Sequence, residues 1–406
     1  MIKAHIIKLK PTKSQDTFFR RSSGVARFAY NWALDKWKED YENGIKKNSA
    51  YTLIKYLNSI KRTEFPWMQD TGKTCSQYAI HNLESAFKGL WKEGKGYPRF
   101  KKKGRMDSFV AVENKNSFKQ NDFKIWIPRL GWVKCSENLR FEGKVNNVVI
   151  KRVANMWFAI INIEVSKYIP TLKQTTGENQ AIVGVDFGIS NMMVLSDGTI
   201  YENPRALKSN LKGLKRLQRS MSRKVKDSNN RKRAQIKLAK KHYRISCIRK
   251  TAIHQATAAI VMKYDRVVIE NLNVVEMLKN HTISQAVGDA SFSEIRRQLT
   301  YKCEWYGKEL VVVDRFYPSS KTCSSCGAIK DIKLSERTYK CDKCGLKMGR
   351  DLNASINLAN FGSTLKYKGS KASGEGSSIP EMEYIPSVKD EIINLSNQIV
   401  QKCTIY

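Results

Sequence analysis

Alternation of apolar and polar residues predicts a β-strand over residues 1–10. One face of this strand carries Ile2, Ala4 and Ile6. From about residue 14 to residue 41 the apolar positions instead recur every three or four residues, which is typical of an amphipathic helix. The same spacing returns in two further stretches, 51–61 and 76–91. The first hundred residues are therefore predicted to form one strand followed by a group of helices.

The pattern changes after Gly104. Short strand-like stretches bounded by turn residues recur at 108–113, 122–127, 148–153 and 156–165. We expect the first strand to join them, so that residues 1–10 and 101–166 form one split β-barrel around an inserted helical domain at 11–100. Residues 167–180 are polar and are interpreted as a linker.

Two strands in the second half of the chain end on a carboxylate. The apolar stretch that begins at Ala181 reaches Asp186, and the stretch that begins at Arg266 reaches Glu270. Asp197-Gly198 favours a tight turn that closes a hairpin after the first of them. The other predicted elements are two helices between about 205 and 264, a helix at 291–306, a strand at 309–314 and a helix at 353–358.

The net charge of the chain indicates which kind of partner it binds. Its 406 residues include 73 Lys and Arg against 37 Asp and Glu, a net charge of +36. Residues 205–250 alone hold 18 Lys and Arg with one acidic residue, Asp227. A solvated helix face is the ordinary explanation of such a run, but this density would repel itself in water unless a polyanion neutralised it. We therefore expect a phosphate-facing helical hairpin and a nucleic-acid partner.

A membrane surface is the competing polyanion. The longest apolar run, at about 157–163, is too short to span a bilayer, and the first ten residues lack the apolar core of a signal peptide. Five of the nine cysteines are scattered, which argues against a disulfide framework and for a reducing cytoplasm. These are Cys75, Cys135, Cys247, Cys303 and Cys403.

The other four cysteines form two Cys-x-x-Cys pairs separated by fourteen residues, Cys323 with Cys326 and Cys341 with Cys344. This spacing can close a tetrahedral site for one Zn²⁺ ion. Most such ribbons stabilise a segment that lacks a core of its own, so we interpret the zinc as structural.

Asp351 follows this motif closely. A carboxylate beside apolar strand residues is unfavourable unless it is paired or bound to a metal. Asp186, Glu270 and Asp351 on neighbouring elements could hold two Mg²⁺ ions, which prefer oxygen ligands, for phosphodiester cleavage. Each has a simpler explanation: Asp186 as a turn residue, Glu270 as a solvent-facing strand end and Asp351 as a helix N-cap. Cut-and-paste transposases also use three acidic residues, but they usually place Glu last, on a helix.

The ordered motifs of this chain resemble the TnpB family, transposon-encoded RNA-guided nucleases related to type V CRISPR effectors and to Fanzor proteins. The resemblance spans about 1–362 and rests on Gly184-Val-Asp186-Phe-Gly188, Val268-Ile-Glu270-Asn-Leu, Ser319-Ser-Lys-Thr-Cys323-Ser-Ser-Cys326-Gly and Arg350-Asp351-x-Asn353-Ala. Upstream matches are Arg27-Phe-Ala-Tyr30-Asn31, Tyr97-Pro-Arg-Phe-Lys-Lys-Lys103 and Pro128-Arg-Leu-Gly131. One departure is Gly349, where the family often has Asp.

The resemblance implies an α+β multidomain fold. The split β-barrel at 1–10 and 101–166 would be the wedge domain, and residues 11–100 the helical recognition domain. Residues 181–320 and 347–362 would form a RuvC nuclease domain with an RNase H-like α/β fold. A Cys₄ zinc ribbon at 321–346 would be inserted into it. Residues 363–406 show no resemblance and have the composition of a disordered tail.

The resemblance also implies an activity. The protein would bind a guide RNA made from its transposon end, recognise a short adjacent motif in double-stranded DNA and cut the DNA that the guide matches. Asp186, Glu270 and Asp351 would hold two Mg²⁺ ions, and the four cysteines one structural Zn²⁺. We expect a prokaryotic, cytoplasmic monomer bound to RNA and associated with the nucleoid when on DNA. The alternatives are a nuclease-dead, RNA-guided repressor and a zinc-ribbon protein without catalysis.

Nucleic-acid contacts are assigned in two groups. Lys73 and Gln77 align with family positions that contact the adjacent motif. The basic residues expected to contact phosphates are Arg99, Lys101, Lys102, Lys103, Lys215, Arg216, Arg219, Arg223, Lys224, Arg231, Lys232 and Arg233. Base stacking is an alternative role for Trp32, Trp37, Trp67 and Trp91, whose spacing is more typical of a helical core.

Overall fold

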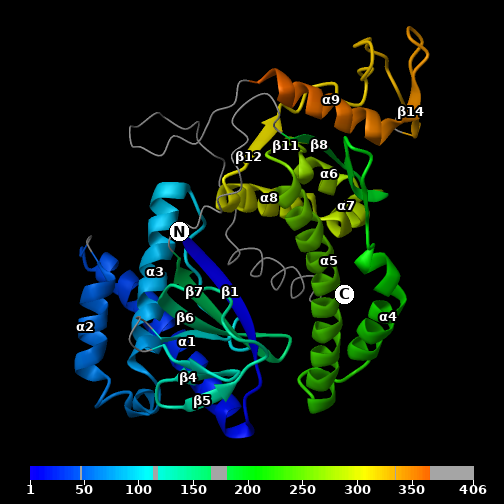
Figure 1. Cartoon of the computed structure of the whole chain (residues 1–406). Helices are drawn as coiled ribbons and strands as arrows, with labels where there is room; N and C mark the ends of the chain where they lie inside the picture. The colour runs from blue at the N-terminus through cyan, green and yellow to red at the C-terminus, as the bar shows by residue number, and fades with distance from the viewer. Residues whose placement is uncertain (46–47, 113–117, 166–180, 334, 366–406) are drawn as a thin grey trace, which may run out of the picture. The chain divides into compact units, whose positions relative to one another are not determined.

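A computed structural model describes residues 1–45, 48–112, 118–165, 181–333 and 335–365. The expected linker at 167–180 and all but the first residues of the expected tail lie outside this part of the chain. The chain divides into two compact units, one within residues 1–165 and one within 181–365. Each unit is described by itself (Figure 1).

The first unit is built on a four-stranded antiparallel sheet in the order β1-β7-β6-β2. Its strands are β1 (Ile2–Leu9), β2 (Ser108–Val112), β6 (Lys144–Val153) and β7 (Met156–Glu164). Strand β1 pairs with β7 along its whole length, which confirms that the first strand joins the later ones. Its buried residues are His5, Ile7 and Leu9, so the face that carries Ile2 and Ile6 is the exposed one.

A second, three-stranded sheet lies beside it. It comprises β3 (Gln120–Asn121), β4 (Lys124–Ile127) and β5 (Gly131–Lys134). A bridge between Leu9 and Cys135, together with a 2.7 Å hydrogen bond from the Lys10 amide to the Lys134 carbonyl, links it to β1.

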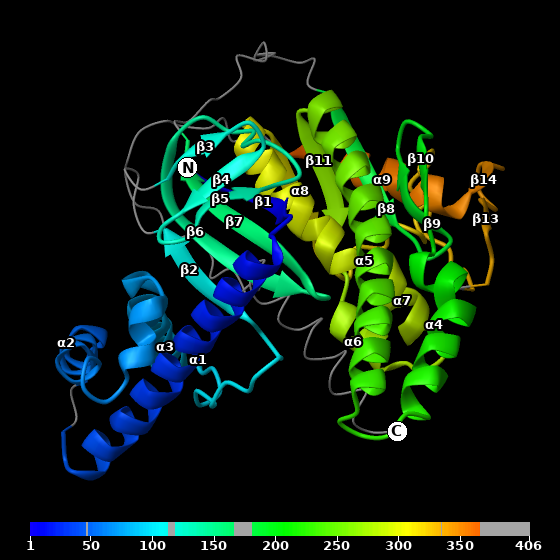
Figure 2. The ribbon, with the colours of Figure 1, turned by 90° about the horizontal axis from the view of Figure 1, so that it is seen from below.

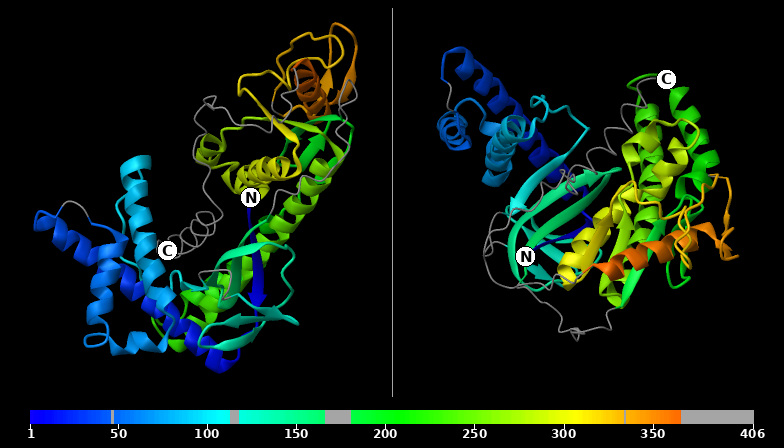
Figure 3. Two further views of the ribbon diagram at one scale, coloured as in Figure 1. Left: turned by 60° about the vertical axis from the view of Figure 1, so that its left-hand side comes forward. Right: turned by 90° about the horizontal axis from the view of Figure 1, so that it is seen from above.

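Helices α1 (Lys13–Glu42), α2 (Ala50–Ile60) and α3 (Lys73–Glu93) follow β1, with the 3₁₀ helix η1 (Pro66–Asp70) before α3. A capping box between Thr12 and Gln15 begins α1. Phe19 of α1 packs on Trp157 of the sheet with ring centroids 5.1 Å apart, so helices and strands share one core. The helices gather at one side of the strands (Figure 3).

The second unit contains a five-stranded sheet in the order β10-β9-β8-β11-β12. Its strands are β8 (Ile182–Phe187), β9 (Asn191–Leu195), β10 (Ile200–Glu202), β11 (Arg266–Glu270) and β12 (Glu309–Val313). Strands β8, β11 and β12 are parallel, whereas β9 and β10 are antiparallel additions. The expected turn at Asp197-Gly198 joins β9 to β10, with Gly198 at φ +85°.

Helices cover both faces of this sheet. The helices of this unit are α4 (Ala206–Ser222), α5 (Asn229–Lys263), α6 (Val274–Lys279), α7 (Ser284–Ala290), α8 (Phe292–Tyr306) and α9 (Arg350–Thr364). Helices α5 and α8 share a core with Val183 and Val267, whereas Leu358 of α9 packs with Val268 on the other face. The short helices α6 and α7 were not predicted from the sequence.

The basic stretch forms the predicted helical hairpin, in which α4 lies beside α5 (Figure 2). Apolar residues line the seam, among them Leu214, Met221 and Leu238. The buried carboxylate of Asp289 accepts hydrogen bonds from the Leu207 and Lys208 amides at the start of α4, and so caps a helix that has no side-chain cap of its own. Among the described residues, no helix is both long enough and apolar enough to cross a membrane.

Candidate active site and metal centre

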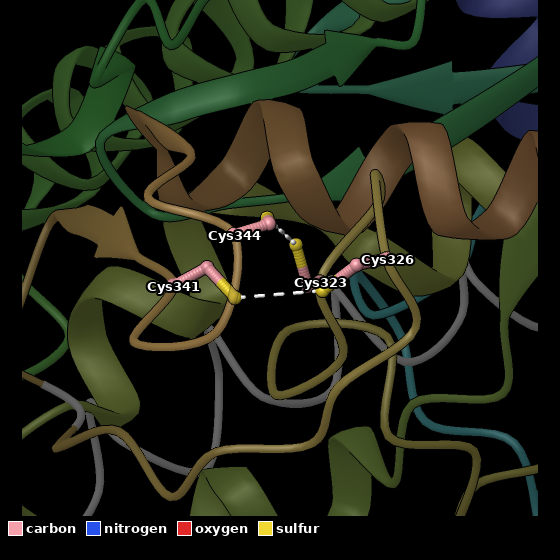
Figure 4. Close-up of side chains that lie close together, drawn as sticks. All are labelled: Cys323, Cys326, Cys341 and Cys344. Carbon is pink, nitrogen blue, oxygen red and sulfur yellow. Dashed lines mark hydrogen bonds between the residues drawn. The ribbon is translucent and has the colours of Figure 1, made fainter.

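The four cysteines of the paired motif converge. The sulfur atoms of Cys323, Cys326, Cys341 and Cys344 all lie within 4.8 Å of one another (Figure 4). Two of the sulfur pairs are 3.6 Å apart. Tetrahedral zinc with bonds of about 2.3 Å to sulfur places its ligands roughly 3.8 Å apart, so the quartet fits a Zn²⁺ ion.

Two matching turns hold these sulfurs. In each turn the first cysteine amide donates a 2.8 Å hydrogen bond to a carbonyl beyond the second cysteine, from Cys323 to Ala328 and from Cys341 to Leu346. Gly327 and Gly345 follow the second cysteines, both at φ +74°, where a Cβ would be strained. The Cys-x-x-Cys-Gly pattern therefore encodes the turn as well as the ligands.

The ribbon has little apolar support. Its strands β13 (Thr338–Lys340) and β14 (Lys347–Gly349) are short, and its core consists of Tyr339 with two of the cysteines and a few half-buried neighbours. Backbone N–H groups of Cys344 and Lys343 stabilise the Cys341 thiolate and lower the pKa of that thiol to about 6. The donors and the small core fit a structural metal site.

The three candidate carboxylates lie on one face of the five-stranded sheet. Strands β8 and β11 pair in parallel with Val185 opposite Ile269, so Asp186 and Glu270 occupy the next positions along the ladder. Side chains alternate between faces. Val185 and Ile269 point to the core under α5 and α8, and the two carboxylates therefore point to the face that α9 covers. Asp351 lies in the first turn of α9.

The electrostatics of Asp186 show how close the three groups are. Burial, and then the negative charges of Glu270 and Asp351, raise the pKa of Asp186 to about 8, while Arg350 opposes the shift. Burial also raises the pKa of Glu270, although a hydrogen bond from Ser319 counteracts it. Asp186 is thus buried beside two carboxylates that disfavour its ionisation, and a divalent cation bound there would relieve this cost.

The oxygen donors fit Mg²⁺ rather than zinc, since hard cations prefer carboxylates. Within the described residues, the cysteine quartet is the only group of three or more His, Cys, Asp or Glu whose ligand atoms all lie within 4.8 Å of one another. The carboxylates are therefore more widely spread than ligands of a single closed site. Such a spread is compatible with the 3.5–4 Å separation of the ions in two-metal centres.

Close packing of α9 on the sheet positions Asp351. A Cβ on Gly184 of β8 would lie 1.9 Å from the Ser355 carbonyl oxygen, and a Cβ on Gly362 would lie 2.5 Å from Val268 Cγ2. Both distances are too short for any side chain, so only glycine allows helix and strands to approach this closely. The buried guanidinium of Arg266 donates hydrogen bonds to the carbonyls of Gly362 and Leu365 and fixes the far end of the helix.

A loop joins the zinc ribbon to the carboxylates. The Ser319 hydroxyl donates a hydrogen bond to the Glu270 carboxylate. The Asn357 side chain donates 2.7 Å hydrogen bonds to the carbonyls of Ser319 and Thr322, and Asn353 donates another to Thr322. Sequence reasoning assigned these residues no role, although two Asn four apart on α9 were a visible signal.

Two of the simpler explanations for the carboxylates are wrong. Gly349 occupies the N-cap position of α9, so Asp351 is inside the first turn rather than a cap. Asp186 lies within β8 rather than in a turn. Glu270 ends its strand as expected, but it is half-buried and bonded to Ser319 instead of pointing freely into solvent.

The structure separates the basic candidates into those on the surface and those with structural contacts. On the hairpin, Lys224 and Arg231 are half-buried, and Arg231 donates a hydrogen bond to the Lys224 carbonyl. The exposed candidates there are Lys215, Arg216, Arg219, Arg223, Lys232 and Arg233.

The candidates in the first unit divide similarly. Lys73 is exposed at the start of α3, and Gln77 lies one turn later, half-buried on the same face of the helix. Arg99, Lys102 and Lys103 are exposed, whereas Lys101 is half-buried with its ammonium 3.7 Å from the centroid of the Tyr30 ring.

Three family models match parts of the chain. "Probable transposase" matches residues 161–281, "Cas12f1-like, TNB domain" matches 292–358 and "Helix-turn-helix domain" matches 1–46. The described residues of the last range, 1–45, hold strand β1 and the one helix α1.

Similar proteins come from bacteria and from a virus. The chain is 31% identical to "Putative RNA-guided DNA endonuclease InsQ" of Escherichia coli (strain K12), over 89% of this chain and 92% of the relative. It is 32% identical to "Putative RNA-guided DNA endonuclease" of Streptomyces pristinaespiralis, over 87% of each. Shorter matches include "TnpB-like protein L79" of Acanthamoeba polyphaga mimivirus, 32% identical over 35% of this chain.

The fold also matches a solved structure. "Cryo-EM structure of the Cas12f1-sgRNA-target DNA complex" superposes with a TM-score of 0.53 at 16% identity, covering 86% of this chain and 83% of that one. The mixed α/β architecture is therefore shared with a protein of very different sequence.

Proposed function

Because the chain belongs to the TnpB family of RNA-guided DNA endonucleases, we propose that it binds a guide RNA and cuts the double-stranded DNA that the guide matches. The observation that carries this proposal is the convergence of Asp186, Glu270 and Asp351 on one face of a sheet. A strongly basic surface on the same chain supports a polyanionic substrate.

The residues of this site have distinct tasks. Asp186 and Glu270 present oxygens from adjacent strands, and Asp351 does so from the helix above them. A pair of Mg²⁺ ions bound there would activate water and stabilise the leaving 3′ oxygen of the cut strand. Ser319 orients the Glu270 carboxylate through its hydrogen bond. Burial and the neighbouring carboxylates raise the pKa of Asp186, so the binding of cations would favour loss of its proton.

The two units have different parts in this proposal. The five-stranded sheet with its helices serves as the RuvC nuclease domain, and the zinc ribbon as its inserted nucleic-acid-binding module. In the first unit, the two sheets serve as the wedge domain and α1–α3 as the recognition domain, where Lys73 and Gln77 contact the motif beside the target. The protein acts in a bacterial cytoplasm as a monomer with its RNA.

Cleavage of a plasmid tests the proposal. The chain is co-expressed with the DNA that flanks its reading frame, purified with the RNA it retains, and mixed with a guide-matched plasmid and Mg²⁺. We expect the parent protein to linearise this plasmid and to leave a mismatched one intact, while Asp186→Ala retains RNA and loses cleavage. Equal cutting by Asp186→Ala would refute the active-site assignment, and the absence of a discrete RNA would refute guidance.

A nuclease-dead repressor is the second candidate. Such a protein would bind the matched DNA and leave it uncut. The three carboxylates of this chain are all present, and the pKa of Asp186 responds to the charges of the other two, which favours the nuclease. A cut-and-paste transposase would instead join DNA ends, so the appearance of joined products in the same assay would favour that class.

A further inference from the structure

A pocket of about 820 Å³ opens on the first unit, away from any residue assigned above to chemistry. One face of α1 forms its floor, and Trp67 of η1 and Phe100 of the segment after α3 form its sides. Pockets that hold small organic ligands span roughly 300–1,000 Å³, so this one has room for a bulky group. Its lining is Gly24, Arg27, Phe28, Asn31, Trp32, Asp35, Trp67 and Phe100.

The walls are aromatic and fixed in place. Phe28 packs edge to face on Trp67 with ring centroids 5.0 Å apart, and on Phe65 at 4.8 Å. Trp67 and Phe100 are each 46% exposed, although the spacing of the tryptophans had favoured a core position. Only Trp37 of the four tryptophans is fully buried. Exposed flat rings held rigidly are suited to stacking.

Backbone contacts hold Phe100 at the pocket. The Asn31 side chain donates a 3.0 Å hydrogen bond to the Lys101 carbonyl and accepts a 2.7 Å one from its amide. These two bonds bind the segment after α3 directly to α1. The same segment carries three exposed cations close to Phe100 in the sequence, namely Arg99, Lys102 and Lys103.

The polar groups of the pocket suit a ring with hydrogen-bonding edges and a phosphate. Lys38 lies 4.9 Å from the centroid of the Phe100 ring, and the Arg27 guanidinium is anchored at 3.5 Å by Asp107. The Asp35 carboxylate is exposed on the pocket wall and forms no hydrogen bond or ion pair with any described residue. Carboxylates accept hydrogen bonds from the exocyclic amino groups of bases, and the planar guanidinium group of arginine stacks on bases.

We propose that this pocket binds an unpaired base of the guide RNA, stacked on Trp67 and Phe100 beside the cations that contact its phosphate. This inference rests on the proposed binding of a guide RNA. RNA is the source because structured RNA offers unstacked bases in loops and bulges, whereas the bases of a duplex target are paired.

Gly24 allows a test that spares the fold. A Cβ there would meet only the Arg27 side chain, at 3.9 Å, so Gly24→Leu extends from the floor of the pocket with no backbone of another element within 4 Å of its Cβ. Leucine also has a higher helix propensity than glycine. Trp67→Ala removes the stacking wall. Trp91→Ala is the matched control, because Trp91 is 64% exposed on α3 and lies outside the pocket.

The experiment footprints the RNA that copurifies with each full-length protein. Dimethyl sulfate probes adenines and cytosines, and a reagent that acylates the ribose 2′-hydroxyl probes every nucleotide. We expect the parent and Trp91→Ala to protect an unpaired nucleotide that Gly24→Leu and Trp67→Ala leave reactive. Removal of one ring on which the base stacks should lower the affinity for RNA roughly tenfold.

Each result has a separate meaning. Identical footprints for all four proteins would show that the pocket does not bind a base of the RNA, and would leave the proposed binding of a guide RNA intact. A change confined to the displaced DNA strand, probed with permanganate in the ternary complex, would assign the pocket to DNA and overturn the RNA proposal. Absence of RNA from the parent would overturn both this inference and the proposed function.

Discussion

Replacement of Asp186 by Asn should stabilise the magnesium-free protein, although it removes a proposed metal ligand. Burial and the neighbouring carboxylates raise the pKa of Asp186 from its ordinary 3.8 to about 8. The folded state therefore resists ionisation of this group, and stability is lost progressively as the pH rises from about 4 to about 8. Because pH 7 lies about three units above the ordinary pKa, the loss of stability at that pH is at most roughly 4 kcal/mol.

Thermal and urea unfolding measure this effect in buffer that contains zinc but no magnesium, so that the ribbon stays intact. We expect Asp186→Asn to unfold at a higher temperature than the parent at pH 7–8 and the advantage to shrink toward pH 4. Saturating Mg²⁺ should stabilise the parent and not the variant, because only the parent retains the full set of ligands.

Asp197 is the matched control, since it lies in the turn between two strands of the same sheet and its pKa shifts the other way. Burial opposes its ionisation, but hydrogen bonds from Lys263 and Tyr264 outweigh burial and lower the pKa of Asp197. Asp197→Asn should therefore destabilise the protein at pH 7, with a cost that fades as the pH falls below about 4. If Asp186→Asn destabilised the protein at pH 8, or if its effect did not change with pH, the electrostatic reasoning would be wrong.

Three other outcomes follow from the contacts. Ser319→Ala should lower the rate of cleavage roughly tenfold and move its pH optimum upward, because Glu270 loses the hydrogen bond that favours its ionised form. Ser319→Thr should restore both the rate and the pH optimum, and an unchanged pH–rate profile in Ser319→Ala would contradict the role assigned to Ser319. Cys341→Ser should abolish the one zinc ion per chain measured by mass spectrometry and lower solubility, since the metal contributes on the order of 10 kcal/mol to folding such a site; a soluble, zinc-free ribbon would show that zinc is not structural. Gly184→Ala should cost roughly 1–3 kcal/mol in urea unfolding because its Cβ would meet the backbone of α9, whereas Gly349→Ala meets nothing within 4 Å and should be nearly neutral.

Local patterns in the sequence predicted the elements that carry the site. Each Cys-x-x-Cys-Gly turn depends on a glycine at positive φ, and the metal site depends on four thiols. The amino-acid sequence shows both the glycines and the cysteines directly. Apolar stretches ending at Asp186 and Glu270 predicted two strands, and the structure forms both. Such features depend on neighbours within a few residues, so a single sequence contains them.

Features that depend on distant contacts were not predictable in the same way. The alternating residues 2–9 predict a strand, but either face could be buried, and the pairing with β7 buries His5 and Ile7 rather than Ile2. Ser319 reaches Glu270 only because a loop, a strand and a helix meet there. The pocket beside Trp67 likewise requires three segments that the sequence does not place together.

Strand β14 of the ribbon ends at Gly349, and helix α9 begins at Arg350, with no residue between them. The helical phase of Asp351 is therefore set by the ribbon itself. One residue inserted at this junction would turn every later position of α9 by about 100° relative to the ribbon. Either Asp351 would rotate away from the sheet or the two glycine contacts would fail. Surface loops tolerate insertions and deletions, but this junction does not. The number of residues between the last cysteine and the helix is therefore as constrained as the identity of the ligands.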